Sequence, residues 1–326
     1  ENSRPVYDDA FTVYKDLLEL LDGAIADLDG DYDSFGAADV LYNGDSGLWK
    51  KFGASLKLRI GMRLAEVPEF NSAIVVTEAI ASGVFSDQSE SAILHYPGVT
   101  PLVNSYYNEF VIIARKDFCP SNTIIDKMNS LNDPRRDIWF TKYNNEYKGL
   151  QYGKAGASSY SSYSHFADMI RINPKYPVIM CDYVEVEFLL AEAAERGLYG
   201  VPGDAEMHYN KAILESMKYW GVTDAATDSY LAQPSVAYST AEGSYKQKIG
   251  TQKWLGLFDR GIESWAEWRR LDFPVLNPPE GMDYSVIPMR MPYPYNENKM
   301  NLANYTAAAS AIGGDLATTR LFWDSN

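Results

Sequence analysis

A tryptophan-rich stretch near the C-terminus, residues 246–276, constrains the fold of this chain more than any other part of the sequence. It reads KQKIGTQKWLGLFDRGIESWAEWRRLDFPVL and holds three of the seven tryptophans. Its large apolar side chains recur at steps of three, four and seven: Trp254, Leu257, Phe258, Trp265 and Trp268. This spacing predicts a single helix with a broad buried stripe. The helix should end by Phe273, because a residue that precedes proline disfavours helical geometry.

The last turn of this predicted helix carries two arginines, Arg269 and Arg270. Cations there complement the negative end of the helix dipole, and a guanidinium can stack on an indole while it pairs with a carboxylate such as Glu263 or Glu267. The segment is therefore either a core helix clamped by an arginine pair or a catalytic or anion-binding arginine site. We favour the core helix, because aromatic stripes at helical spacing are usually buried.

Composition and charge restrict what the protein can bind. The 326 residues are 46% apolar and 22% charged, which is a globular balance. A net charge of −15 disfavours a nucleic-acid partner, because phosphates would be repelled. No apolar run is long enough to span a membrane as a helix. The 24 tyrosines are unusual and suit a wet binding surface, since a phenol ring joins a flat apolar face to a polar tip.

Cysteine and histidine positions predict neither a metal site nor a disulfide scaffold. These residues lack metal-ligand spacing: Cys119, Cys181, His95, His165 and His208. The sequence also contains no nucleophile elbow, phosphate-binding loop, dinucleotide fingerprint or zinc-binding helix. Acidic residues are too numerous for any pair to identify a glycosidase. We therefore expect no catalytic residues, no metal and no cofactor.

Periodic apolar residues predict an all-α fold in which tetratricopeptide-like helix pairs support long irregular loops. The segments with helical spacing are 8–29, 48–65, 71–82, 122–131, 183–194, 205–219 and 305–311. Small, large and small residues recur at tetratricopeptide spacing in two of them: Ala54, Leu58, Gly61 and Ala205, Tyr209, Ala212. The helix at 183–194 is apolar nearly all round and should be central. Two such pairs are too few for a stable solenoid, so other helices should complete the stack.

The aromatic residues of a long irregular region, 85–177, are the candidate ligand-binding residues. They are Tyr106, Tyr107, Phe110, Trp139, Tyr143, Tyr147, Tyr152, Tyr160 and Tyr163. Loops of this length in a compact protein are usually functional. Neighbouring amide and hydroxyl side chains, among them Asn144, Asn145, Ser158, Ser159 and Ser161, suit the hydroxyl rim of a sugar ring. Alternatively, each tyrosine anchors its loop to the helices, which is the better interpretation for any single one.

Several motifs resemble those of one known family. The long C-terminal motif consists of Gln252, Lys253, Trp254, Gly261, Glu263, Trp265, Glu267, Arg269, Arg270, Phe273, Pro274 and Leu276. WKKFGASLKLRIGMRLA at 49–65 and YPVIMCDYVEVEFLLAEAAERG at 176–197 add to it. Together they resemble the SusD/RagB family of surface glycan-binding lipoproteins from Bacteroidetes. Departures occur at Gly53 and Ala54, where Ala-Asn is usual, at Cys181, where Thr is common, and at Met289.

The resemblance implies a single SusD-like domain over residues 1–326 that lacks the N-terminal portion of the family. It implies a protein that binds an oligosaccharide at the outer-membrane surface and delivers it to a SusC-like TonB-dependent porin, without catalysis. The export signal and the lipid-bearing cysteine would then lie outside this chain. Three alternatives stay open: a peptide-binding member of the same family, a secreted glycosidase, and a helical-repeat adaptor. The long loops disfavour the adaptor.

Overall fold

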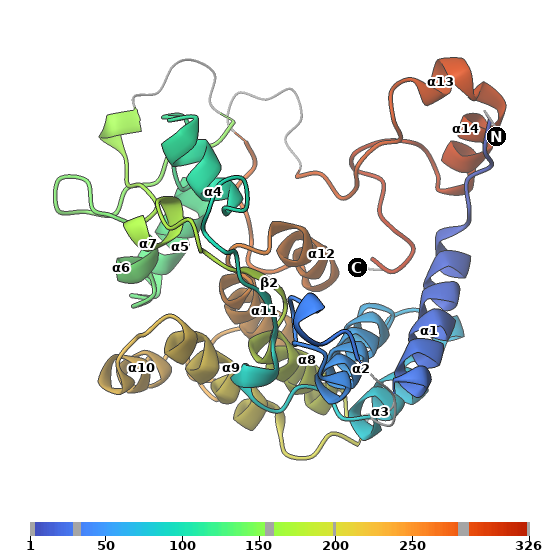
Figure 1. Ribbon diagram of the computed structural model, residues 1–326, viewed down its shortest axis with the longest axis horizontal. Helices are drawn as coiled ribbons and strands as arrows, with labels where there is room; N and C mark the ends of the chain where they lie inside the picture. The colour runs from blue at the N-terminus through green and yellow to red at the C-terminus, as the bar shows by residue number, and fades with distance from the viewer. Residues whose placement is uncertain (1–3, 29–33, 154–159, 198–199, 280–286, 325–326) are drawn as a thin grey trace.

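The computed structural model describes residues 4–28, 34–153, 160–197, 200–279 and 287–324. This part of the chain forms a mostly helical fold, as predicted (Figure 1). The longer helices are α1 (Ala10–Asp27), α2 (Ser46–Arg63), α3 (Ser72–Ala81), α5 (Asn122–Ser130), α8 (Tyr183–Arg196), α9 (Ala205–Tyr219), α10 (Asp224–Leu231), α11 (Tyr245–Gly256), α12 (Gly261–Leu271) and α14 (Leu302–Ala311). The shorter ones are α4 (Ser105–Tyr107), α6 (Arg136–Trp139), α7 (Asp168–Arg171) and α13 (Glu297–Met300).

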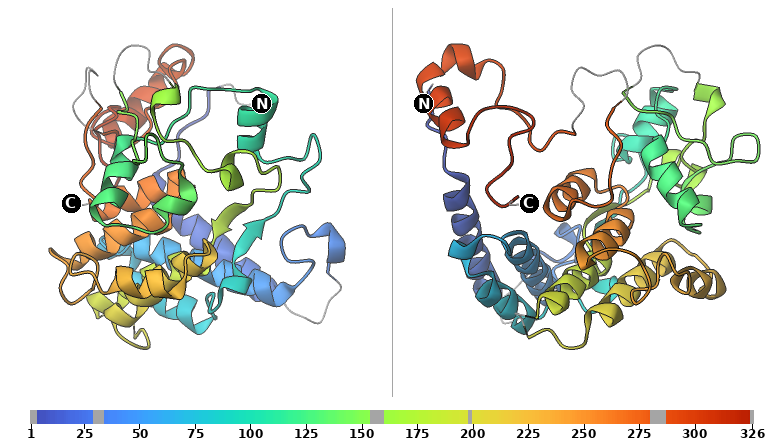
Figure 2. Two further views of the ribbon diagram at one scale, coloured as in Figure 1. Left: turned by 90° about the vertical axis from the view of Figure 1, so that its left-hand side faces the viewer. Right: turned by 180° about the vertical axis from the view of Figure 1, so that it is seen from behind.

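The seven segments with helical spacing all form helices, close to their predicted bounds. We call α1, α2, α3, α8, α9, α11 and α12 the helix frame. In it α2 packs against α1, α3 and α8, while α8 packs against α9 and α11 (Figures 1 and 2). The small residues of α2 permit this packing. A Cβ on Gly61 would lie 2.8 Å from Val76 Cγ2, and one on Gly53 would lie 2.8 Å from Ile25 Cγ1.

Helix α8 is the centre of the frame, as its apolar sequence predicts. Eleven of its 14 residues are buried. It begins at the N-cap Asp182, whose carboxylate accepts from the Glu185 amide at 2.9 Å. It ends at Gly197, which takes a left-handed conformation with φ 67°.

The region at 85–177 holds more regular structure than the sequence predicts. Besides the predicted α5, it contains α4, α6, α7 and a five-residue π-helical turn (Asn108–Ile112). Strand β1 (Ala92–Leu94) pairs antiparallel with β2 (Val178–Cys181), so the two ends of the region meet. Segments of three to five residues are too short to show a periodicity, so the sequence does not predict them. Helix α10 is likewise not predicted.

The prediction that Trp254, Trp265 and Trp268 share one helix is wrong. Two helices, α11 and α12, are separated by a turn in which Asp259 has φ 68°. The apolar stripe is therefore shared between two helices with different partners. Trp268 is 8% exposed and belongs to the core, while Phe258 stacks on Trp139 with ring centroids 3.9 Å apart. The helix does end before Pro274, as predicted, with Asp272 in a left-handed C-cap conformation.

The two arginines at the end of α12 are core residues, in agreement with the favoured interpretation. Arg269 is 6% exposed and its guanidinium carbon lies 3.9 Å from the Trp265 ring centroid. Arg270 is 1% exposed and pairs with Glu267. The predicted stacking and the predicted ion pair therefore both form, but on different arginines.

A network of buried ion pairs joins α2, α8, α11 and α12. Glu267 is 3% exposed and accepts from Lys253 of α11 and from Arg270 of its own helix, both at 2.6 Å. Arg63 of α2 donates to the other carboxylate oxygen of Glu267 at 3.2 Å. Arg270 also donates to both carboxylate oxygens of Glu192 on α8, each at 2.5 Å. A buried charge without a partner is costly, and every charge in this network has at least one.

The pKa values of the two buried glutamates show that attraction by nearby cations outweighs the effect of burial. Burial alone would raise the pKa of the Glu267 carboxyl, but attraction by Arg270, Lys253 and Arg63 outweighs burial and holds that pKa well below its usual range. Burial likewise opposes ionisation of Glu192, and Arg270 lowers the pKa of that carboxyl below its usual range. Both side chains are therefore ionised in the folded protein at neutral pH.

Removing the central carboxylate should destabilise the protein strongly. We expect Glu267→Gln to lower the free energy of unfolding by about 3 to 5 kcal/mol, because buried cations lose their shared partner. The matched control is Asp168→Asn, since Asp168 pairs with Arg171 at 2.7 Å but its side chain is 64% exposed. Its cost should stay below about 1 kcal/mol. Urea unfolding followed by circular dichroism measures both values, and equal losses would contradict the role given to the network.

The same carboxylates predict how stability depends on pH. Their folded pKa values are lower than their unfolded values, so their contribution is complete above the unfolded pKa, about 4.3. It is lost as pH falls through the folded pKa values. The free energy of unfolding should therefore decline below about pH 4, and less steeply in Glu267→Gln than in the wild type. Urea unfolding across this pH range tests the expectation, and identical acid slopes would refute it.

Candidate functional site

Most of the predicted ligand-binding residues lie in a separate part of the molecule, which we call the loop lobe. It comprises residues 104–153 and 160–177 and includes α4 to α7. Figure 1 shows it in green to one side of the helix frame, and Figure 2 shows the same separation from behind. Ser158 and Ser159 lie outside the described residues.

Trp139 anchors the loop lobe to the frame and is not available to a ligand. Its side chain is 0% exposed, and its ring stacks on Phe258 and meets Trp220 at 5.3 Å between centroids. Beside it, the buried Arg135 pairs with Asp133 at 2.5 Å and donates to Ser216 Oγ on α9 at 2.9 Å. The sequence placed Trp139 among the loop aromatics because α6 is only four residues long.

Tyr106 also faces the frame. Its hydroxyl donates to the Asp259 carboxylate in the turn between α11 and α12. Its ring stacks on Phe110 and Phe166, with centroids 6.3 and 6.1 Å apart. Burial raises the pKa of Tyr106, and the Asp259 charge raises it further. These contacts support the anchoring interpretation for Tyr106. Its neighbour Tyr107 is half-buried.

Tyr143 and Tyr163 come together around one lysine, and we call Tyr143, Lys148 and Tyr163 the tyrosine platform. Lys148 Nζ lies 5.3 Å from the Tyr143 ring centroid and 5.1 Å from that of Tyr163. Both rings are half-buried and Lys148 is exposed. Two hydrogen bonds between the neighbouring segments position the two rings. The Lys148 amide donates to Ser164 Oγ and the Ser164 amide donates to the Lys148 carbonyl, both at 2.9 Å.

A tight turn sets the position of Tyr143 in the platform. Tyr143 and Glu146 exchange backbone hydrogen bonds of 2.8 and 3.0 Å. The two residues between them, Asn144 and Asn145, have φ 49° and 65°. Positive φ at both central positions is the pattern of a two-residue hairpin turn, which asparagine tolerates well. These two asparagines therefore have a structural role in addition to their predicted contact with ligand.

The other predicted tyrosines lie apart from the platform. Tyr147 packs between two cations, with Arg136 at 4.6 Å and Lys142 at 5.2 Å from its ring centroid. Burial, followed by a hydrogen bond with Asp137, raises the pKa of Tyr147 to about 12. Tyr160 stacks on His165 at 3.8 Å between centroids. Tyr152 donates its hydroxyl to the carbonyl of Asn277, which lies beyond α12.

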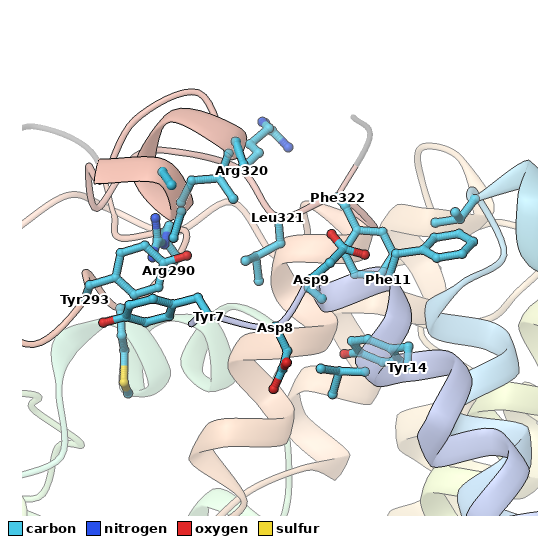
Figure 3. Close-up of a pocket in the computed structure, with 18 of the residues that line it drawn as sticks. Tyr7, Asp8, Asp9, Phe11, Tyr14, Arg290, Tyr293, Arg320, Leu321 and Phe322 are labelled. Atoms are coloured by element: carbon cyan, nitrogen blue, oxygen red, sulfur yellow. The ribbon is translucent and has the colours of Figure 1, made fainter. Parts of the chain in front are cut away.

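Another cavity lies outside the loop lobe, and no prediction from the sequence pointed to it. It has a volume of about 1050 Å³ and is enclosed by the N-terminal segment, the start of α1 and the C-terminal tail. Figure 3 shows Tyr7 and Tyr293 against each other on one side and Phe11, Tyr14 and Phe322 on the other. Residues from opposite ends of the chain form it, so no local pattern marks it. The aromatic residues of the C-terminal tail were the one feature of the sequence that could have indicated this cavity.

Three arginines that line this cavity already have partners within the protein. Arg269 donates to the carbonyl of Met289 at 2.8 Å. Arg320 pairs with Asp324 at 2.5 Å, and Arg290 lies 3.3 Å from Asp315. The rings likewise pack on one another, with Tyr7 and Tyr293 centroids 4.5 Å apart. These cations are therefore engaged within the protein, and we take the loop lobe, where the predicted aromatic residues lie, as the candidate site.

The residues described above contain no group of three or more histidine, cysteine, aspartate or glutamate side chains placed to hold a metal ion. Along the same residues, no helix is both long and apolar enough to cross a membrane.

Comparisons with known proteins agree with the fold and name a family. A chitin-binding protein of known structure shares 27% identity, with a TM-score of 0.84, over 99% of this chain and 75% of its own. A chitin-binding SusD homologue from Flavobacterium johnsoniae shares 25%, with a TM-score of 0.85, over 100% and 75%. A SusD homologue from Bacteroides uniformis shares 28%, with a TM-score of 0.86, over 99% and 74%. No match was found among curated proteins.

The chain is thus similar in fold over its whole length to proteins about a third longer than itself. The SusD-like family, described as "Starch-binding associating with outer membrane", matches residues 1–294. This match confirms the resemblance seen in the C-terminal motif. The chain belongs to the SusD-like family.

Proposed function

We propose that the protein binds a neutral oligosaccharide at the outer-membrane surface and delivers it to a SusC-like TonB-dependent porin. The observation that carries this proposal is the family match over residues 1–294, because the family is described as starch-binding and associated with the outer membrane. Two of the similar structures are of chitin-binding proteins. In this proposal the protein is a binding protein without catalysis, held at the membrane by a lipid anchor.

We place the ligand on the tyrosine platform. Tyr143 and Tyr163 present flat, partly exposed rings whose apolar faces suit the apolar face of a sugar ring. Lys148 between them offers ammonium donors to sugar oxygens. Tyr143 and Lys148 belong to a hairpin and Tyr163 to a neighbouring segment, all outside the helix frame, so the shape of the platform can serve binding without a cost to the core. Tyr107, Tyr152 and Tyr160 stay secondary candidates, and Trp139 is left out because it is buried.

Removing the platform rings should weaken binding and spare the fold. We expect Tyr143→Ala/Tyr163→Ala to bind a soluble chitin oligosaccharide or a maltooligosaccharide at least about tenfold more weakly, since two stacking surfaces are lost. Isothermal titration calorimetry measures the affinity, and circular dichroism checks the helix content. Tyr295→Ala is the control, because Tyr295 is 75% exposed and lies in the C-terminal tail. Unchanged affinity in the double variant would exclude the platform as the site.

The salt dependence of binding separates a neutral ligand from a charged one. Stacking and hydrogen bonds to a neutral sugar are barely screened, so the affinity should change less than about twofold between low and high salt. The same titrations at about 50 and 500 mM sodium chloride test this expectation. A steep loss of affinity with salt would indicate a charged ligand and would contradict the neutral-sugar proposal.

A further inference from the structure

A second hollow in the loop lobe differs from the large cavity in the chemistry of its lining. It has a volume of about 630 Å³ and lies between the first turns of α5 and the extended segment at 274–279 that follows α12. We call it the polar groove. Seven of the twelve residues that line it carry amides, hydroxyls or charges: Asn122, Thr123, Asp126, Lys127, Ser130, Gln151 and Asn277.

The backbone around the groove is held by close contacts. The Asn122 amide donates to the Leu150 carbonyl at 2.9 Å, which brings the strand-like segment at 149–152 against the start of α5. Gly149 makes this approach possible, because a Cβ there would lie 2.5 Å from the Asn122 backbone. Tyr152 then ties the same segment to Asn277 through its hydroxyl. The groove is therefore formed by three chain segments with fixed relative positions.

Two amide side chains give the groove its hydrogen-bonding pattern. Asn122 Oδ1 is buried, and within the described structure it accepts no hydrogen bond. A buried acceptor without a donor costs about 1 to 3 kcal/mol, so such an atom calls for a donor from water or from a ligand. Beside it on α5, Thr123 Oγ1 donates across the groove to Asn277 Oδ1 at 2.8 Å. The Asn277 oxygen is thereby engaged, and within the described residues its Nδ2 makes no hydrogen bond and is the donor.

The charge of the groove favours a neutral ligand. Asp126 and Lys127 are its charged lining residues, and their charges are opposite. An acidic sugar would require an excess of cations, which these two residues do not provide. A hydroxyl-bearing sugar can donate to Asn122 Oδ1 and accept from Asn277 Nδ2, and its ring can lie beside the prolines of the 274–279 segment.

We propose that the polar groove is a carbohydrate subsite that holds one neutral sugar unit through hydroxyl contacts with Asn122, Thr123 and Asn277. This inference rests on the proposed function, since it adds a hydrogen-bonding subsite to the stacking surface of the tyrosine platform. The platform supplies apolar contact, and the groove supplies the directional contacts that distinguish one sugar from another.

The test replaces groove polar atoms by groups of similar size and measures sugar binding. Thr123→Val/Asn277→Ala removes a hydroxyl and an amide, and keeps the Asn277 carbonyl that Tyr152 uses. Titration with the same chitin oligosaccharide and maltooligosaccharide should show affinity at least about tenfold weaker for the one that the wild type binds. The control Thr306→Val/Asn298→Ala makes the same chemical changes at exposed positions of α14 and α13, and should bind as the wild type.

Two further variants keep the outcome interpretable. Asn277→Ala alone retains Thr123 and should still bind more weakly, which guards against a folding defect of the double variant. Thr123→Ser keeps the hydroxyl, so it should bind more tightly than Thr123→Val/Asn277→Ala. Thermal unfolding of each variant shows whether it is folded.

The results separate the failure of this inference from that of the proposed function. Wild-type affinity in folded Thr123→Val/Asn277→Ala, together with weak binding by the platform variant, would overturn the groove and leave the proposed function standing. If the wild type binds neither oligosaccharide, the proposed function fails for these ligands and the subsite fails with it.

Discussion

The helix frame depends on ion pairs that are buried out of reach of water. Glu267 lies between cations from three helices. One of them, Arg270, also pairs with Glu192 of α8. Because each charge needs a partner of opposite sign at hydrogen-bonding distance, the helices cannot shift past one another by a turn without leaving a buried charge alone. Apolar packing alone would permit more than one such arrangement. The ion pairs therefore set the register of the frame that supports the loop lobe.

The sequence predicts the frame well because long helices show their apolar periodicity locally. It failed at the junction of α11 and α12, where the apolar spacing continues across a turn. Phe258 keeps the helical phase of Trp254 and Trp265, yet packs on Trp139 of a distant segment. Gly256 and Gly261, which flank the turn, were a usable signal.

The candidate site is predicted less completely, since it depends on contacts between distant segments. The predicted aromatic residues do lie in one lobe, but the sequence could not separate the buried Trp139 from the partly exposed Tyr143 and Tyr163. Burial of a side chain in a four-residue helix depends on what packs over it. The polar groove joins Asn122 to Asn277, and no motif links positions so far apart in the chain.

The turn between α11 and α12 has a mechanical consequence. Phe258 stacks on Trp139, and the neighbouring Asp259 accepts a hydrogen bond from the Tyr106 hydroxyl, so two adjacent residues of this turn hold two separate segments of the loop lobe. Through these two contacts, a force on a ligand bound to the loop lobe acts on the turn and on the two helices that it joins, α11 and α12. The orientation of the loop lobe therefore follows that of α11 and α12.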